Sequence, residues 1–513
     1  MRFKKIIALV VLNSALLAYA DNNDSNLSTN IDVGNFIAND STPFPKVKIN
    51  DSFGSLISES QVGAYKPDSL YKFYRNSICG GVYGFNCKSN IKNLNQYTGV
   101  NLEQESGLIG QDFSQINAYK VVYTTQGMDN KEHRVSGAIL LPQSDQPLKG
   151  VIIFYHFTVL NKDNVPSRFN KDELDLSKTI ASTLASDGYA VVMPDYVGLG
   201  DDSKTVHPYV IYPVNNALSG IYMLKLLDKI QPSLSYNLVN KKIPLFLSGY
   251  SEGGAYSLWA AKILQDNPDY LKRYGYKLTK TVPMEGAYNL SKVTLPFLME
   301  SSPKVQAQPF LVGNERIATF AKPALVANVL NSYEYYANPK ISESIVFNSK
   351  FASCVGCTVN DANYTLPQLI EAPAGEATKY KLIHQAAGEA GYSMKNSSIM
   401  PLTTSELLNN PDFLETIEDG DIYNWKATTP ISFMTLEYDS IVTRLNAEAA
   451  YAAMVAQGSS SLNITVIPNQ NFKTKSYIPF SDMNIDHPSG LSFMLLFARN
   501  QFDESSPSVP VNH

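Results

Sequence analysis

The residues 249–253 read Gly-Tyr-Ser-Glu-Gly, the stretch of this chain best suited to covalent chemistry. They follow an apolar run at 243–247 and precede small and apolar residues at 255–264 that predict a helix. A serine on such a strand-to-helix turn needs glycines two residues away, because larger side chains would collide there. The helix would also aim the backbone N–H of Glu252 at a developing oxyanion. The pattern therefore predicts a nucleophile, Ser251, with Glu252 as oxyanion donor.

A serine hydroxyl is a poor nucleophile unless a base takes its proton and an acid orients that base. In parallel sheets such groups are expected in the loops that follow the carboxyl ends of strands. Asp439 follows an apolar run at 429–436, and His487 lies in the loop after the last predicted strand, 463–467. The sequence thus predicts the chain order serine, aspartate, histidine, with Ser251, Asp439 and His487 as the catalytic residues.

His487 is preferred as the base because of its place after the last strand. The other histidines are expected to be solvated, structural, or bound to loops by hydrogen bonds. They are His133 in a hairpin, His156 and His207 in loops before the serine, His384 on a predicted helix, and His513 at the chain end.

The acid has two rivals nearby. Glu437 lies closer to the strand end and can point into the sheet edge, whereas Asp486 adjoins His487, where neighbouring side chains usually diverge. Asp195 also follows a strand, but is expected to form a turn. Asp439 is therefore preferred.

The order of predicted elements indicates an α/β fold with a mostly parallel, doubly wound sheet. Two alternating stretches, 115–123 and 133–141, predict an antiparallel hairpin. Strands and helices then alternate, which is typical of a parallel sheet covered on both faces. The strands are expected at 151–155, 189–193, 243–247, 280–284, 429–436 and 463–467, and the helices at about 172–186, 215–230, 255–264, 446–456 and 489–499.

Regular alternation stops after residue 290 and returns near 430. A connection of this length needs helices of its own, so residues 291–429 predict an inserted cap, or lid, with helices at about 315–320, 378–387 and 404–417. The remaining divisions are a signal peptide at 1–20, an N-terminal extension at 21–110 that opens as a poorly ordered leader, core segments at 111–290 and 430–500, and a tail at 501–513.

The N-terminus predicts export. Basic residues at positions 2, 4 and 5 precede an apolar run and the small-residue cleavage site 18–20, and the run is too short to anchor the chain in a membrane. Cleavage before about Asp21 would remove three of 42 basic residues, against 47 acidic ones, which leaves a formal charge of −8. Such a charge disfavours nucleic acid and anionic membranes as partners.

Four cysteines in an exported chain predict disulfides, with three possible pairings. Cys79 and Cys87 lie close together, and Cys354 and Cys357 form Cys-x-x-Cys. Zinc is disfavoured because no further histidine or cysteine stands at ligand spacing.

These motifs together resemble the α/β-hydrolase superfamily, in particular its exported bacterial esterases and secretory-lipase-like serine hydrolases. The resemblance covers roughly residues 115–500 and rests on 249–253, Pro-Asp-Tyr-Val-Gly-Leu-Gly at 194–200, His-Pro-Tyr at 207–209, and Asp-Ser-Ile-Val at 439–442. It implies an α/β-hydrolase fold and a carboxylic-ester hydrolase, esterase or lipase, that acts on small-molecule or lipid esters through an acyl-enzyme, with no metal or cofactor.

The resemblance also implies roles for single residues. They are Ser251 as nucleophile, His487 as base, Asp439 as orienting acid and Glu252 as one oxyanion donor. The second donor would be an N–H after the strand 151–155. Such enzymes often have glycine after the histidine there, whereas this chain has Phe157, so the donor stays open between Phe157 and Thr158.

Two other functions remain open. A serine peptidase on the same fold needs the same acyl transfer, and a silent hydrolase-fold protein would only bind. Retention of all three triad residue types argues against the silent protein. In the cap, Tyr333, Tyr335 and Tyr336 are candidates either for lining an acyl pocket or for packing.

Overall fold

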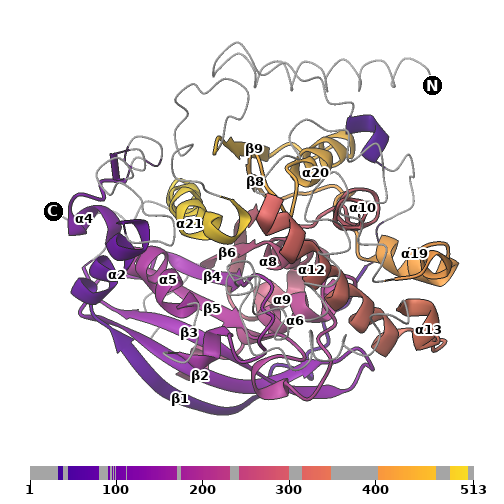
Figure 1. Ribbon diagram of the computed structural model, residues 1–513. Helices are drawn as coiled ribbons and strands as arrows, with labels where there is room; N and C mark the ends of the chain where they lie inside the picture. Colours follow the sequence, from indigo (N-terminus) through magenta and orange to yellow (C-terminus); the bar gives the residue numbers. More distant parts are fainter. Residues whose placement is uncertain are drawn as a thin grey trace, which may run out of the picture.

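A nine-stranded sheet forms the centre of the computed structural model, which describes residues 33–37, 44, 46–79, 91–110 in part, 112–169, 175–230, 242–299, 315–347, 403–469 and 486–506. The strands are β1 (Leu56–Tyr65), β2 (Gln115–Gln126), β3 (Glu132–Gln143), β4 (Gly150–Tyr155), β5 (Tyr189–Pro194), β6 (Ile243–Tyr250), β7 (Tyr276–Met284), β8 (Ile431–Leu436) and β9 (Leu462–Ile467). Their order is β1-β2-β3-β5-β4-β6-β7-β8-β9, from the bottom to the top of Figure 1.

The strands from β5 to β9 in this order pair in parallel, whereas β1, β2 and β3 pair antiparallel and join β5 antiparallel. Every residue of β4, β5, β6 and β8 is buried. Continuous apolar runs are typical of strands covered on both faces, and this is why the sequence predicts them well. The mostly parallel sheet is confirmed.

Strand β1 was not predicted from the sequence. Most of its residues are exposed, and it lies at the edge of the sheet against β2. The expectation of a poorly ordered opening is wrong where this region is described. The short 3₁₀ helix Val33–Phe36 buries Val33 and Phe36 in an apolar cluster with Leu445. The described residues 33–36 therefore pack onto the core.

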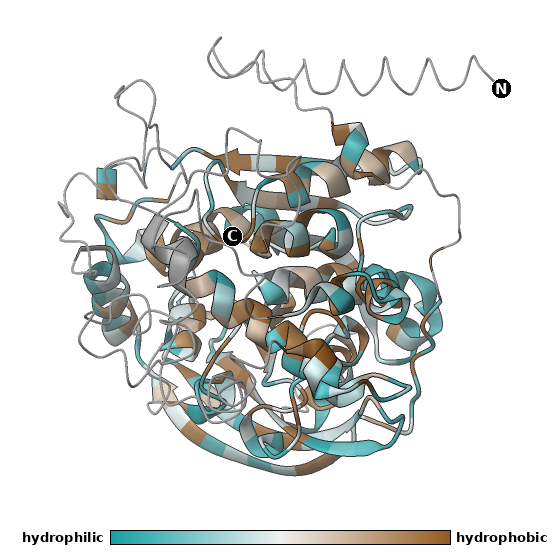
Figure 2. Ribbon diagram, turned by 45° about the vertical axis from the view of Figure 1, so that its right-hand side comes forward, coloured by the Kyte–Doolittle hydropathy of each residue, from teal (hydrophilic) through white to brown (hydrophobic). Residues whose placement is uncertain are grey.

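Helices cover both faces of the sheet because successive side chains of a strand point to opposite sides. Ile152 and Phe154 pack in one apolar cluster with α2 (Pro67–Cys79), α5 (Leu176–Thr183) and α21 (His487–Asp503). Ile153 and Tyr155 pack in another with α6 (Pro213–Met223), α8 (Glu252–Asp266), α9 (Pro268–Arg273) and α20 (Leu445–Ala456). Figure 2 shows hydrophilic and hydrophobic residues mixed along the helices, as expected where one side faces a sheet. The doubly wound arrangement is confirmed.

The segment between β7 and β8 contains helices of its own. They are α10 (Leu295–Leu298), α12 (Glu315–Tyr336), α13 (Glu343–Val346), α18 (Ser405–Leu408) and α19 (Pro411–Asp419), of which α10, α13 and α19 lie on the right in Figure 1. The helix predicted at 315–320 is the start of the longer α12, the one at 404–417 is divided into α18 and α19, and 378–387 lies outside the described residues.

An apolar cluster, named here the insertion cluster, holds this segment to the rest of the protein. It joins Leu330 of α12 and Ile417 of α19 to Tyr209, Ile441 and Val442, which belong to the loops of the core. Ile441 and Val442 directly follow the predicted acid, so the insertion and the acid's loop share one packed interior.

Two of the three tyrosines considered for an acyl pocket have packing roles. The Tyr333 ring packs edge-on against Phe413, with 4.8 Å between centroids, and the Tyr336 hydroxyl donates to the Val206 carbonyl at 2.6 Å. Tyr335 is 47% exposed. The contacts of Tyr333 and Tyr336 favour packing.

Some predictions lie outside the described residues. These are the signal peptide, His384, His513, Cys87, Cys354 and Cys357, and the side chain of Cys79 is also not described. The pairing of the cysteines therefore stays a prediction. Among the helices that the structure describes, none combines the length and apolar character needed to cross a bilayer.

We predict that Phe502→Ala destabilises the protein by about 3–5 kcal/mol, the usual cost of emptying a buried aromatic site. Phe502 is fully buried in α21 between the rings of Tyr189 and Phe246. Urea unfolding followed by tryptophan fluorescence measures the loss. The matched control is Leu414→Ala on α19, whose side chain is exposed and whose removal should cost under about 0.5 kcal/mol. Equal midpoints for both variants would contradict the predicted anchoring of α21.

Candidate active site

Ser251 occupies a strained turn between β6 and α8. Its backbone angles, φ 58° and ψ −121°, lie outside the regions that L-residues usually adopt. Its N–H donates to the Met284 carbonyl at the end of β7, at 3.0 Å, and its carbonyl accepts from Gly254 at 2.9 Å. Hydrogen bonds from its N–H and to its carbonyl thus hold Ser251 in a backbone conformation that is unfavourable for an isolated serine.

The glycines around Ser251 allow the turn to approach β4. A Cβ on Gly253 would lie 2.0 Å from the carbonyl oxygen of Tyr155, and one on Gly249 would lie 2.1 Å from the carbonyl oxygen of Gly253. Both distances are far below van der Waals contact, so the predicted reason for the glycines is confirmed.

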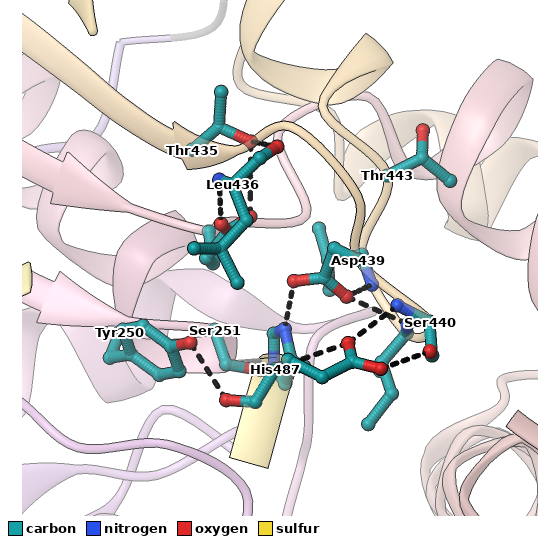
Figure 3. Close-up of polar contacts among 12 residues, drawn as sticks. Tyr250, Ser251, Thr435, Leu436, Asp439, Ser440, Thr443 and His487 are labelled. Carbon is teal, nitrogen blue, oxygen red and sulfur yellow. Dashed lines mark hydrogen bonds and ion pairs between the residues drawn. The ribbon is translucent and has the colours of Figure 1, made fainter. Parts of the chain in front are cut away.

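The three residues predicted from the sequence meet in one chain of hydrogen bonds (Figure 3). His487 Nε2 lies 2.7 Å from Ser251 Oγ, and His487 Nδ1 lies 2.6 Å from Asp439 Oδ2. Asp439 and His487 are buried. An ionised Asp439 accepts only, so it selects the tautomer with the proton on Nδ1, and Nε2 is then free to accept from the serine hydroxyl.

Asp439 is aimed at the histidine by its own loop. Its second carboxylate oxygen, Oδ1, accepts the backbone N–H of Ile441 at 2.7 Å and that of Val442 at 2.8 Å. The first oxygen is left for His487. These two bonds fix the orientation of the carboxylate through the backbone of the residues that follow it.

Asp486, one alternative candidate for the acid, holds the backbone on which Asp439 and His487 lie. Its Oδ1 accepts the backbone N–H of Ser440 at 2.9 Å and that of His487 at 2.7 Å, and its Oδ2 accepts the Ser440 hydroxyl. It caps α21, which begins at His487, and ties that helix to the residue after Asp439. The Tyr250 hydroxyl donates to the His487 carbonyl at 2.7 Å. These bonds join the loop after Asp439 to the start of α21.

Glu437, the other rival, is buried at the end of β8, where its N–H pairs with Ile467. Burial raises the pKa of this carboxyl and the charge of Arg444 lowers it, with a net rise. The carboxylate that is hydrogen-bonded to the imidazole of His487 belongs to Asp439.

The predicted oxyanion donors lie around the same turn. Glu252 is the first residue of α8, so its N–H has no carbonyl partner within the helix. Phe157 and Thr158 follow the end of β4, whose last carbonyl faces Gly253. The Thr158 hydroxyl lies 3.1 Å from that of Tyr209. The choice between Phe157 and Thr158 stays a prediction.

Comparison with known proteins agrees with this geometry. Residues 164–272 match the family model of secretory lipases. Among solved structures, similarity extends to a protein from Legionella pneumophila proposed to be a hydrolase, with TM-score 0.62 and 19% identity, covering 89% of this chain and 100% of that one. The rice cell wall degrading esterase LipA from Xanthomonas oryzae gives TM-score 0.60 and 18% identity, covering 88% and 99%. The chain has the α/β-hydrolase fold.

A third structure with this α/β-hydrolase fold is Candida antarctica lipase A, with TM-score 0.52, 14% identity, and coverage of 89% of this chain and 83% of that one. A search of curated protein sequences finds no match. The secretory-lipase match supports the expectation of a carboxylic-ester hydrolase.

His207 has a contact that sequence reasoning did not anticipate. Its Nε2 lies 2.6 Å from Glu252 Oε1 and its Nδ1 lies 2.7 Å from the Val197 carbonyl. Burial raises the pKa of Glu252, but the charge of His207 and hydrogen bonds from His207 and Tyr256 outweigh it and hold the pKa below its ordinary value. The hydrogen-bonded pair of His207 and Glu252 therefore lies directly beside Ser251.

Two sequence motifs, residues 194–200 and residues 207–209, lie around the pair of His207 and Glu252. A Cβ on Gly198 would lie 2.5 Å from the backbone nitrogen of His207, so the loop 194–200 and the sequence His-Pro-Tyr pack together. Both motifs can be recognised in the sequence before Ser251. The contact between His207 and Glu252 could not be predicted, because it forms only when the chain folds.

His156 is fully buried and stacks on Tyr196, with 4.2 Å between ring centroids. Its Nδ1 donates to the Phe157 carbonyl at 2.7 Å. Burial lowers the pKa of this imidazole to about 4, although the hydrogen bond to Phe157 opposes the shift. The expectation of packing and loop hydrogen bonding is confirmed for His156.

We predict that Gly253→Ala destabilises the protein by about 1–3 kcal/mol, the usual cost of overpacking, because its methyl group would meet the Tyr155 carbonyl. The same change should slow labelling of Ser251 by a fluorophosphonate. Gly63→Ala in β1 is the control, since a Cβ there meets nothing within 4 Å. Wild-type labelling and melting of Gly253→Ala would show that the turn tolerates a side chain.

A second prediction concerns His156, whose folded-state pKa of about 4 lies below the ordinary 6.5. Above pH 6.5 both states are neutral. As the pH falls towards 4, the unfolded imidazole binds a proton first, so this residue's contribution to stability is lost, up to about 3 kcal/mol. The stability of wild type relative to His156→Gln, measured by urea unfolding, should therefore fall between pH 7 and 4.5. A difference that stays constant with pH would argue for an imidazole that titrates normally.

Proposed function

We propose that the protein is an exported serine hydrolase, an esterase or lipase, that cleaves carboxylic esters through an acyl-enzyme. The observation that carries this proposal is the hydrogen-bonded chain from Asp439 through His487 to Ser251, with distances of 2.6 and 2.7 Å, at a strained strand-to-helix turn. A structural serine needs neither the strain nor a base at hydrogen-bonding distance.

In the first half-reaction Ser251 Oγ attacks the ester carbonyl carbon while its proton passes to His487 Nε2. Asp439 stabilises the imidazolium that forms, and it stays ionised itself. The carbonyl oxygen becomes an oxyanion, which accepts hydrogen bonds from the Glu252 N–H and from the N–H of Phe157 or Thr158. The tetrahedral intermediate then collapses, His487 returns its proton to the alcohol, and the acyl group remains on the serine.

The second half-reaction repeats these steps with water as the nucleophile. His487 Nε2 takes a proton from the water as it attacks the acyl carbon, and then returns the proton to Ser251 Oγ as the carboxylic acid leaves. The site needs no metal or cofactor for either half.

We also propose that residues 291–429 form a cap that shapes the acyl site. The insertion cluster supports this, because it joins α12 and α19 to loops beside Asp439 and His207. Export through a signal peptide at residues 1–20 is supported by the match of residues 164–272 to secretory lipases. The substrate would be a small-molecule or lipid ester.

We predict that Ser251→Ala lowers ester hydrolysis by on the order of 10⁴-fold or more while leaving the melting temperature unchanged, because the fold does not depend on one hydroxyl. A series of nitrophenyl esters with increasing acyl-chain length provides the assay and separates esterase from lipase preference. Peptide substrates in parallel test for a serine peptidase.

His487→Ala and Asp439→Ala should each impair turnover severely, and adding either to Ser251→Ala should change little, because the three residues act as one unit. Folded Ser251→Ala protein that still turns over esters would falsify the proposed function. A harmless His487→Ala change would leave the serine mechanism standing with a different base.

A further inference from the structure

Near His487 and Asp439 lies a further carboxyl group, that of Glu285, which has no role in the mechanism proposed above. Glu285 is the residue after β7, it is 1% exposed, and its φ of 47° is positive. One oxygen of its carboxyl group, one of Asp439 and one ring nitrogen of His487 lie within 4.8 Å of one another. A non-glycine residue in this conformation is strained, and such strain is kept where surrounding contacts hold it.

The contacts of Glu285 fix its carboxyl group firmly. Its backbone N–H donates to the Met434 carbonyl at 3.0 Å. One carboxyl oxygen accepts the Leu436 N–H, and the other accepts the Thr435 hydroxyl at 3.1 Å. Glu285 is therefore held to the end of β8, three residues before Asp439.

Two buried carboxyl groups this close cannot both be ionised, since each charge disfavours the other. The proton belongs on Glu285. Asp439 faces His487, which gains charge during the reaction, whereas Glu285 accepts from the neutral donors Leu436 and Thr435. Burial first, and then the charge of Asp439, raise the pKa of Glu285 well above its ordinary value, against the hydrogen bonds from Leu436 and Thr435.

Other titratable groups near this pair are Asp486, Tyr250 and Tyr288. Burial chiefly raises the pKa values of all three, and the charges of neighbouring carboxyl groups add to the rise. The two tyrosines are therefore neutral at ordinary pH, and neither they nor Asp486 can carry the positive charge that would stabilise an ionised Glu285 beside Asp439.

We propose that Glu285 is a positioning residue: as a neutral carboxylic acid it donates a hydrogen bond to Asp439 and holds that carboxylate under His487. Asp439 then receives donors from two directions, its own loop at Ile441 and Val442 and the end of β7 at Glu285. The inference rests on the proposed function, because it assigns Glu285 a role in the same triad.

Two variants test the proposal. Glu285→Gln keeps the shape, an acceptor for Leu436 and an N–H donor for Asp439, so kcat should stay within about 3-fold of wild type and the pH profile of kcat/KM should keep its shape. Glu285→Leu removes the donor, so kcat should fall on the order of 10-fold to 100-fold, the size that a misplacement of about 1 Å can produce, with KM within about 2-fold. A merely structural role would lower the yield of folded enzyme without this division between kcat and KM.

Protonation is measured directly by infrared spectroscopy. The difference between wild type and Glu285→Gln at neutral pH should contain the C=O band of a neutral carboxylic acid. This readout needs no activity, so it stands even where Glu285→Leu fails to fold. Absence of the band, a pH profile altered by Glu285→Gln, or a folded Glu285→Leu enzyme with wild-type kcat would each overturn the proposal.

A cation shared by the two carboxylates is the competing interpretation of this cluster. It predicts that EDTA lowers wild-type activity and that calcium or zinc restores it, and that result would also overturn the proposal. Fluorophosphonate labelling separates this inference from the proposed function. Failure of wild type to label Ser251 defeats both, whereas normal labelling with silent Glu285 variants defeats only the role of Glu285.

Discussion

A single imidazole, His487, joins three segments that lie far apart in the chain. It bonds to Ser251 at the end of β6 and to Asp439 after β8, and it is itself the first residue of α21. Both bonds form at once because β6 and β8 lie in the same sheet, separated only by β7. The parallel sheet is thus what brings the hydroxyl of Ser251, the imidazole of His487 and the carboxylate of Asp439 within hydrogen-bonding distance, and its buried strands supply stability that offsets the strain at Ser251.

Burial around the site makes its charges strongly interdependent. On one side of Ser251 the carboxylate of Glu252 is matched by His207 at 2.6 Å, and on the other Asp439 is matched by His487. Asp195 and Asp486 behave differently, because burial raises the pKa values of both carboxyl groups. These two instead receive hydrogen bonds from hydroxyl and backbone N–H groups, Asp195 from Ser136 and Ser167. Ser251 therefore lies near two acids that each pair with a histidine, in a buried neighbourhood where unpaired charge is disfavoured.

Much of this arrangement could be predicted from the sequence, because its signals are local. The apolar runs of β4, β5, β6 and β8 report burial on both faces, and the glycines around Ser251 report a close approach that the structure contains. Strand β1 was missed because an exposed edge strand carries polar residues and no clear alternation. Glu285 and the pairing of His207 with Glu252 were missed for another reason. Their meaning comes from contacts across strands and loops, and nothing in their sequence neighbours records those contacts.

The insertion cluster has a consequence for how this protein can change. Ile441 and Val442 place their side chains among those of α12 and α19, while their backbone N–H groups hold the carboxylate of Asp439. The insertion proposed to shape the acyl site and the carboxylate proposed to orient the base therefore both contact the same two residues. Substitutions in the interior of the insertion that move Ile441 or Val442 are therefore expected to move Asp439 as well. Substrate selectivity and reaction rate would then change together.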